Sequence, residues 1–233
     1  MYEHASSAWQ ACDSFVEFRR DFNVPVTLAG RHVTLVPLEP KVHGDSLFRQ
    51  TTGVMNDQLW TYLFDGPFTN RTDFLAHLVQ KATSDAAMFF AILSNNSGSA
   101  VGYASYMRIE PVHRCMEVGR ILYSPILQRT AGATETMYLM ARHAFDDLGY
   151  RRYEWKCDAR NEPSRRAALR LGFQFEGIFR QHMIIKGGNR DTAWYAMVDG
   201  DWPVRKANFE RCLSPKNFDA AGKQVVSLSE MGR

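Results

Sequence analysis

The sequence contains no long apolar run that could cross a membrane. Its longest apolar stretch, residues 86–93, is far shorter than the roughly 20 residues that a spanning helix needs. Residues 1–10 also lack the basic start and apolar stretch of a secretion signal. We therefore expect a cytoplasmic protein with no membrane partner.

Cysteine is scarce, and no two cysteines form a C-x-x-C pair. The four are Cys12, Cys115, Cys157 and Cys212. This scattered arrangement predicts neither a zinc site nor a disulfide framework, so we expect no metal.

The chain has no strong excess of one charge. Its 28 basic residues against 25 acidic ones give a formal charge of +3, and the two signs are interspersed. A nucleic-acid-binding protein usually gathers basic residues on one face, so we expect no nucleic-acid partner. The 45% apolar and 23% charged composition over 233 residues is typical of a globular chain of one large or two small domains.

Hydrophobic periodicity predicts an α/β domain in the middle of the chain. We place an N-terminal arm at residues 1–29, the domain at residues 30–202, and a C-terminal helix with a loose tail at residues 203–233, packed on the domain or trailing it. Apolar residues that alternate with polar ones predict strands at 31–38, 88–93, 100–109, 115–123 and 152–158, and a closing hairpin at 173–185 and 192–198. Three- and four-residue spacing predicts helices at 42–51, 69–84, 133–148 and just after Asn161 and Asp201.

The turn between the predicted strand at 115–123 and the following helix has the character of a phosphate-binding loop. Its small residues Ala131, Gly132 and Ala133 would let a phosphate approach the free N–H groups of the helix start. It is neither a P-loop nor a G-x-G-x-x-G turn. Tight packing of a helix on a strand explains the same small residues without a ligand, so both interpretations stay open.

Two motifs carry a resemblance to a known family. Residues 129–134 resemble the Q/R-x-x-G-x-G/A pyrophosphate loop of the GNAT N-acetyltransferases, although Thr134 departs from the final small position. Residues 161–177 resemble the N-x-x-S and G-F-x-x-E-G signature of the RimJ/RimL-type branch, with Asn161 and Ser164 in the first part. The likeness covers roughly residues 28–202.

This resemblance implies a mixed, twisted sheet that is splayed into a V and flanked by helices. Acetyl-coenzyme A (acetyl-CoA) would enter between the strands ending near Tyr123 and Asp158. The coenzyme-binding residues it implies are Ile121, Leu122, Tyr123, Gln128, Arg129, Thr130, Ala131, Gly132, Ala133, Thr134, Asn161, Ser164 and Arg165. We expect a bulky residue at Gly132 to weaken coenzyme binding while leaving the fold largely intact.

Ser164 is the predicted proton source or hydrogen-bond partner of the departing thiolate, because the resemblance places the serine of N-x-x-S beside the sulfur. The alternative is that Ser164 only helps to cap its helix. Asn161 has the same two interpretations, helix cap and coenzyme contact.

Glu117 and His182 are the two candidate bases. Several family members carry a catalytic glutamate where Glu117 stands, and a partly apolar cleft would raise its pKa. The alternative is a salt bridge with Arg120 or Arg114. The glutamate that RimL-type enzymes place on a later strand is replaced here by Met183, which leaves His182 as the second candidate.

The aromatic segment of residues 59–68 is the predicted acceptor-binding loop. An amine can rest on aromatic faces beside a carboxylate, which points to Trp60, Tyr62, Phe64 and Asp65. Equally, some of these rings could fill the core. Arg190 would orient an acceptor or pin the adjacent turn.

The resemblance therefore implies an acyltransferase that moves acetyl from acetyl-CoA to a primary amine of a small molecule, such as an amino acid, a polyamine or an amine-bearing metabolite or toxin. A RimJ/RimL-like N-terminal protein acetyltransferase is the alternative within enzymes. A non-catalytic acyl-CoA-binding module is the alternative of another class. The protein would act as a monomer or homodimer.

Overall fold

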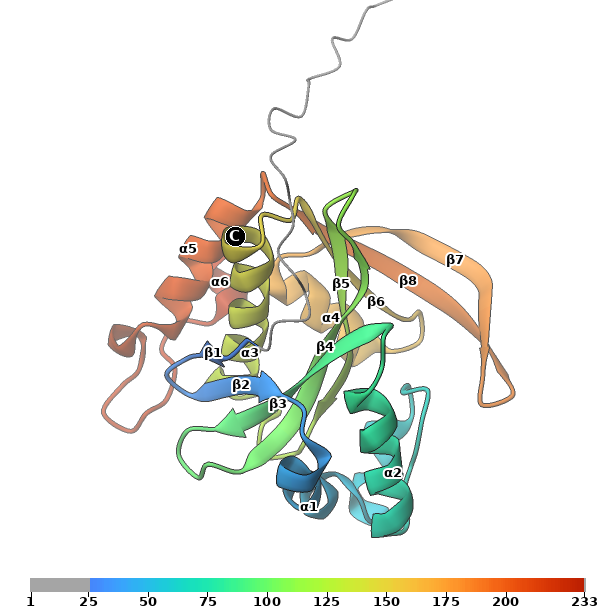
Figure 1. The fold of residues 1–233 in the computed structure, drawn as a ribbon. Helices are drawn as coiled ribbons and strands as arrows, with labels where there is room; N and C mark the ends of the chain where they lie inside the picture. The colour runs from blue at the N-terminus through green and yellow to red at the C-terminus, as the bar shows by residue number, and fades with distance from the viewer. Residues whose placement is uncertain (1–25, 233) are drawn as a thin grey trace, which may run out of the picture.

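A computed structural model describes residues 26–232, which form one eight-stranded sheet with helices on both faces (Figure 1). The strand order is β1-β2-β3-β4-β5-β6-β8-β7, and β5–β6 is the parallel pair. The strands are β1 (Leu28–Ala29), β2 (Val33–Pro37), β3 (Ala87–Ser94), β4 (Ala100–Glu110), β5 (Cys115–Tyr123), β6 (Arg152–Asp158), β7 (Gln174–Ile185) and β8 (Gly188–Val198).

Two apolar clusters lie on opposite faces of this sheet because successive strand residues point to opposite sides. On β3, Phe90 and Ile92 join one cluster, whereas Phe89 and Ala91 join the other. The first cluster includes side chains from α3 (Ala131–Arg142), α4 (Glu162–Leu171) and α5 (Trp202–Leu213). The second includes side chains from α1 (Pro40–Thr51), η1 (Val54–Trp60) and α2 (Arg71–Ala82). We call these the α3 face and the α2 face.

The parallel strands β5 and β6 are paired over only part of their length. Their register runs from Cys115 opposite Arg152 to Val118 opposite Trp155. Beyond that point β5 continues to Tyr123 and β6 to Asp158 without pairing with each other. The sheet is therefore open at its centre, as the resemblance implies.

A β-bulge lies on β5 within this unpaired part. Tyr103 is opposite Leu122 and Ser105 is opposite Gly119, so β5 contains one extra residue against β4. Arg120 at the bulge has φ 49°, in the left-handed region. A bulge re-aims its side chains, and here it directs Arg120 toward the α2 face, where its guanidinium lies 5.4 Å from the Phe64 ring.

The predicted α/β fold class and element order are confirmed, with differences at three places. The predicted helix at 133–148 is α3 followed by a π-helical turn, η2 (His143–Asp147). Leu28 and Ala29, assigned to the arm, pair with β2, while the rest of the arm lies largely outside the described residues. The tail is more ordered than expected, with η3 (Pro215–Asn217), α6 (Leu228–Met231) and a buried Leu228.

Glu135 of α3 ties this helix to the start of β2. Its carboxylate accepts hydrogen bonds from the backbone N–H groups of Arg31, His32 and Val33 at 2.8, 2.6 and 2.9 Å. The side chain is only 4% exposed. A buried carboxylate with three backbone donors satisfies groups that the edge of the sheet would otherwise leave unpaired.

We predict that Glu135→Ala lowers the free energy of unfolding by about 3 kcal/mol or more, because hydrogen bonds to a charged group are worth about 1.5–3 kcal/mol each and buried donors would lose their partner. Urea denaturation measures this change. The control is Glu210→Ala, which removes an exposed acceptor of the Tyr138 hydroxyl and should cost less than about 1 kcal/mol. Equal costs for the two variants would contradict the anchoring role of Glu135.

Candidate functional site

The N-terminus of α3 presents free backbone N–H groups beside the opening of the sheet. Thr130 is the N-cap, and its hydroxyl oxygen accepts from the N–H of Ala133 at 3.2 Å. The N–H groups of Ala131 and Gly132 precede the first intrahelical bond. Together with the positive φ of Arg129, this arrangement can hold a phosphate.

Gly132 is buried and crowded. A Cβ atom there would lie 3.0 Å from Val33 Cγ1 and 3.4 Å from Leu127 Cδ1. Our expectation that a bulky residue at Gly132 leaves the fold largely intact is therefore wrong, because a large side chain has no space between the helix and the sheet. Packing alone explains this glycine.

Thr134, the departure from the family motif, is 6% exposed, and its hydroxyl accepts from Arg170 Nη1 at 3.2 Å. Nearby, Gln128 Nε2 donates to the carbonyl of Tyr123 at 3.1 Å. Past Val118, the backbone groups of Ile121 to Tyr123 that point toward β6 have no partner strand. These groups are available to a ligand in the opening.

Ser164 lies on the α3 face at the start of α4. Its hydroxyl oxygen accepts from the indole N–H of Trp155 at 3.0 Å. The helix cap is Asn161, whose side-chain oxygen accepts from the N–H of Ser164 at 3.2 Å. Ser164 is therefore not the cap. The indole occupies one lone pair of the hydroxyl oxygen, and the Ser164 side chain also hydrogen-bonds to the Cys157 thiol.

Arg165, the next predicted coenzyme contact, is engaged inside the protein. Its Nε donates to the Tyr195 hydroxyl at 3.1 Å, and its Nη1 donates to the Ala159 carbonyl at 3.3 Å. These contacts give Arg165 a structural role at the start of α4.

Glu117 lies on the α2 face in a buried ion pair. Its Oε2 is 2.8 Å from Lys156 Nζ and 3.7 Å from Arg108 Nε, and both side chains of the close pair are 6% exposed. The cationic partners of Glu117 are thus Lys156 and Arg108, not the Arg120 or Arg114 of our salt-bridge alternative. Burial raises the pKa of Glu117, while the nearby Lys156 opposes that rise.

His182 of β7 lies near the Glu117–Lys156 pair, on the other side of Trp194. Its Nδ1 is 2.9 Å from Thr192 Oγ1, and its ring lies 5.9 Å from the ring of Trp194, which Lys156 also contacts. The pKa of His182 is lowered by partial burial and by neighbouring cations, first among them Arg190. The histidine is therefore mainly neutral at pH 7 and able to accept a proton.

Trp60 belongs to the core rather than to an acceptor wall. It is 0% exposed, its indole donates to the Thr51 carbonyl at 2.7 Å, and it packs edge-on against Phe68 and Phe74. Tyr62 is half-buried, and its hydroxyl donates to the Arg160 carbonyl at 3.1 Å. Tyr62 therefore links the aromatic segment to the loop after β6.

Phe64 and Asp65 remain at the surface of the opening. The Phe64 ring lies 5.4 Å from the guanidinium of Arg120 and 5.2 Å from that of Arg190. Asp65 pairs with Lys81 Nζ at 3.1 Å. Burial works to raise the pKa of Asp65, but the charge and hydrogen bond of Lys81 outweigh it and hold the pKa below its usual value. Asp65 is thus an already paired carboxylate.

Sequence reasoning missed Lys156 and Trp155, which engage the two predicted chemical groups. The alternation of residues 152–158 predicts the strand, but it also implies that the polar residues between the apolar ones share the opposite face of that strand. Tyr153, Trp155 and Cys157 face the α3 side, which leaves Glu154 and Lys156 on the opposite, partly buried face.

Comparison with known proteins identifies the family of this chain. Residues 32–174 match the family described as acetyltransferase (GNAT) domain. A GCN5-related N-acetyltransferase from Brucella melitensis is 45% identical, with TM-score 0.86 over 88% of this chain and 93% of that one.

Two curated relatives align over 98 residues, 42% of this chain. An uncharacterized N-acetyltransferase, YoaA, of Bacillus subtilis (strain 168) is 32% identical. The ribosomal-protein-serine acetyltransferase of Escherichia coli (strain K12) is 29% identical. The alignments span 55% and 54% of these relatives, so the chain matches about half of their length.

No helix within residues 26–232 is long and apolar enough to span a bilayer.

We predict that Gly132→Trp lowers the thermal midpoint sharply, because overpacking a filled site costs about 1–3 kcal/mol or more. Gly132→Ala should be nearly neutral, since the gain in helix propensity of about 1 kcal/mol offsets the close contact with Val33. Calorimetric melting of both variants checks this. A wild-type midpoint for Gly132→Trp would contradict the crowding at this helix start.

Proposed function

The chain belongs to the GNAT acetyltransferase family, and we propose that it transfers an acetyl group from acetyl-CoA directly to a primary amine of a small molecule. One observation carries the proposal: a hydroxyl donor and a buried carboxylate flank the opening between β5 and β6 from opposite faces of the sheet. Ser164 lies against Trp155 on the α3 face, and Glu117 lies against Lys156 on the α2 face.

In this reaction the amine nitrogen attacks the thioester carbonyl, a C–N bond forms and the C–S bond breaks. The amine loses a proton to Glu117, directly or through water, and Glu117 then releases it to solvent. The departing thiolate takes a proton through the Ser164 hydroxyl, which regains one from water. Backbone N–H groups of Ile121 to Tyr123 would stabilise the developing oxyanion. The free N–H groups at the start of α3 would hold the coenzyme's pyrophosphate.

The side chains around each group suit these roles. The Trp155 indole orients the Ser164 hydroxyl by donating to its oxygen, and the departing thiolate would compete with the Cys157 thiol for the serine proton. Burial raises the pKa of Glu117 and makes it a better base than a free carboxylate, while the ammonium of Lys156 opposes that rise.

A second candidate function is N-terminal protein acetylation of the RimJ/RimL type. The relative named ribosomal-protein-serine acetyltransferase favours it, as does the N-x-x-S signature at Asn161 and Ser164. A screen for free-thiol release from acetyl-CoA against small amines, amino acids and peptide N-termini, with coenzyme binding measured alongside, separates the candidates. Coenzyme binding without turnover would instead indicate a non-catalytic acyl-CoA-binding module.

We predict that Ser164→Ala lowers kcat by about 10²–10⁴-fold with little change in coenzyme affinity, since general-acid help is worth about that factor. Steady-state kinetics and calorimetric coenzyme titration measure the two quantities. Ser229→Ala, on the exposed side of α6, is the matched control. Wild-type turnover by folded Ser164→Ala would remove the serine from the chemistry.

We predict that wild-type kcat/KM rises with pH, because a base must be deprotonated to act. Glu117→Gln should move that rise toward the amine's own pKa, about 8 for an α-amine and 10.4 for an alkylamine. At pH 7 the loss of kcat/KM in Glu117→Gln, relative to wild type, is then large for an alkylamine and modest for an α-amine. Lys156→Met removes the opposing cation, so the pKa of Glu117 rises further and the profile shifts to higher pH.

His182→Gln is the parallel variant for the second candidate base. If Glu117→Gln leaves the profile unchanged while His182→Gln flattens it between about pH 6 and 7, the base is His182 and our assignment is wrong.

A further inference from the structure

Two arginines from separate strands converge on one ring at the acceptor side of the opening. Arg120 of β5 and Arg190 of β8 place their guanidinium carbons 5.4 and 5.2 Å from the centre of the Phe64 ring. Phe64 lies in the segment after η1, so three distant parts of the chain meet here. Two like charges at one ring repel each other, and such an arrangement calls for a compensating anion.

The protein's own carboxylates near this ring are already paired with other cations. Asp65 lies 3.1 Å from Lys81, Asp158 lies 2.8 Å from Arg160, and Glu117 lies 2.8 Å from Lys156. Within residues 26–232, neither Arg120 nor Arg190 has a carboxylate oxygen at ion-pair distance. Asp158 and Glu117 act on Arg190, and Asp65 on Arg120, only at longer range, so these two arginines lack a close compensating carboxylate.

Both arginines are at least partly buried, and one buried donor between them has no partner. Arg190 is only 8% exposed, and its Nε donates to Thr192 Oγ1 at 3.2 Å. The buried Nε of Arg120 has no hydrogen-bond partner in the described part of the chain. Leaving a buried guanidinium donor unpaired is costly, which favours a ligand that completes it.

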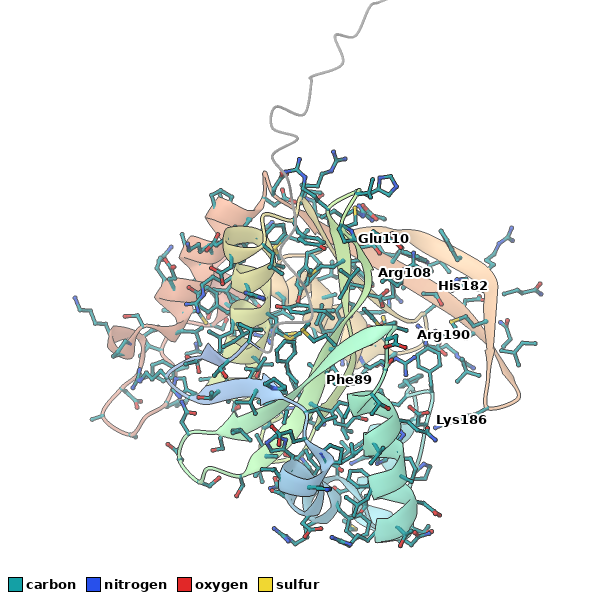
Figure 2. The ribbon with its side chains drawn as sticks, viewed as in Figure 1. Phe89, Arg108, Glu110, His182, Lys186 and Arg190 are labelled. Carbon is teal, nitrogen blue, oxygen red and sulfur yellow. The ribbon has the colours of Figure 1, made fainter. Side chains whose placement is uncertain are left out.

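The surroundings hold this pair in place. The bulge of β5 directs Arg120 toward Phe64. Lys186, at the tip of the β7–β8 hairpin, donates to the Trp60 carbonyl at 2.8 Å and so ties the hairpin to the segment that carries Phe64. Figure 2 shows Arg108, His182, Arg190 and Lys186 on the same side of the molecule, around the concave surface of the hairpin.

We propose that Arg120 and Arg190 bind a carboxylate of the acceptor, so that the substrate is an amine that also carries an acidic group. This inference rests on the proposed acetyltransferase function, because it assigns the anion to the acceptor. Planar guanidinium groups match a carboxylate with paired hydrogen bonds. The anion comes either from a small amino acid-like molecule or from an acidic residue near a peptide N-terminus.

The test compares acceptors that differ only in the charge of one group. One arm uses ω-amino acids of increasing length, each against its amide. The other uses amidated peptides with Asp or Asn at the second position. We expect kcat/KM to favour the acidic member of at least one matched pair by about 10-fold or more, mainly through KM, because the carboxylate contributes binding.

Variants then assign that preference to the two arginines. Arg120→Met and Arg190→Met should each lower kcat/KM for the acidic acceptor by about 10- to 100-fold. For the matching amide, kcat/KM should stay within about threefold of the wild-type value. Arg120→Lys and Arg190→Lys should recover part of the loss. Arg211→Met, at the exposed end of α5, is the control for net charge and should change neither acceptor.

Three outcomes overturn the proposal. The first is a wild-type preference below about threefold for every acidic acceptor in both arms. The second is an unchanged preference in folded Arg120→Met, which keeps the test decisive if Arg190→Met does not fold. The third is a loss of acetyl-CoA affinity as large as the loss of kcat/KM, because the arginines would then serve the coenzyme.

A measurement that needs no turnover separates this inference from the proposed function. Butyrate and butyramide are titrated into the protein with coenzyme A present, and the Nε–H resonances of Arg120 and Arg190 are followed by NMR. Saturable shifts with butyrate alone support the carboxylate site even if no amine is acetylated. Absence of shifts overturns the site even if some neutral amine is acetylated.

Discussion

The separation of β5 from β6 is the constraint on which the rest of the site depends. Two parallel strands that pair only as far as Val118 and Trp155 leave backbone groups without a partner strand in the middle of a sheet. Buried backbone groups require partners, so a ligand that lies along the opening can supply what the missing strand pairing does not. The helix start at Thr130 and the α4 start at Asn161 both border the same opening.

Side-chain alternation then distributes the chemistry between two faces. On β6, Trp155 points to the α3 face and contacts Ser164, whereas the next residue, Lys156, points to the α2 face and contacts Glu117. One strand thereby positions a hydroxyl donor on one side and a carboxylate on the other. A one-residue shift in the register of β6 would exchange these environments, so the strand pairing of β6 with β8 also sets the geometry of the proposed acid and base.

The fold and the main motifs were predictable because they depend on local patterns. Periodicity predicts the strands and most helices, and Asn161 is the helix cap, which is one of its two interpretations from the sequence. The roles of single side chains were less predictable. Trp60 reads as a binding aromatic in the sequence, yet it is buried because α1, α2 and η1 close around it. The sequence places Glu117 on a strand, but its partner Lys156 comes from the neighbouring strand, which spacing along the chain does not specify.

Charge pairing across strands is the property that sequence reading could not supply, and it also decides the character of the acceptor side. The net charge of +3 gives no hint of a cationic site, because acids and bases are interspersed along the chain. In the fold, Lys81, Lys156 and Arg160 take the nearby carboxylates, and Arg120 and Arg190 are left facing one ring. The selectivity we infer for acidic amines therefore arises from which cations remain after pairing, not from how many cations the chain contains.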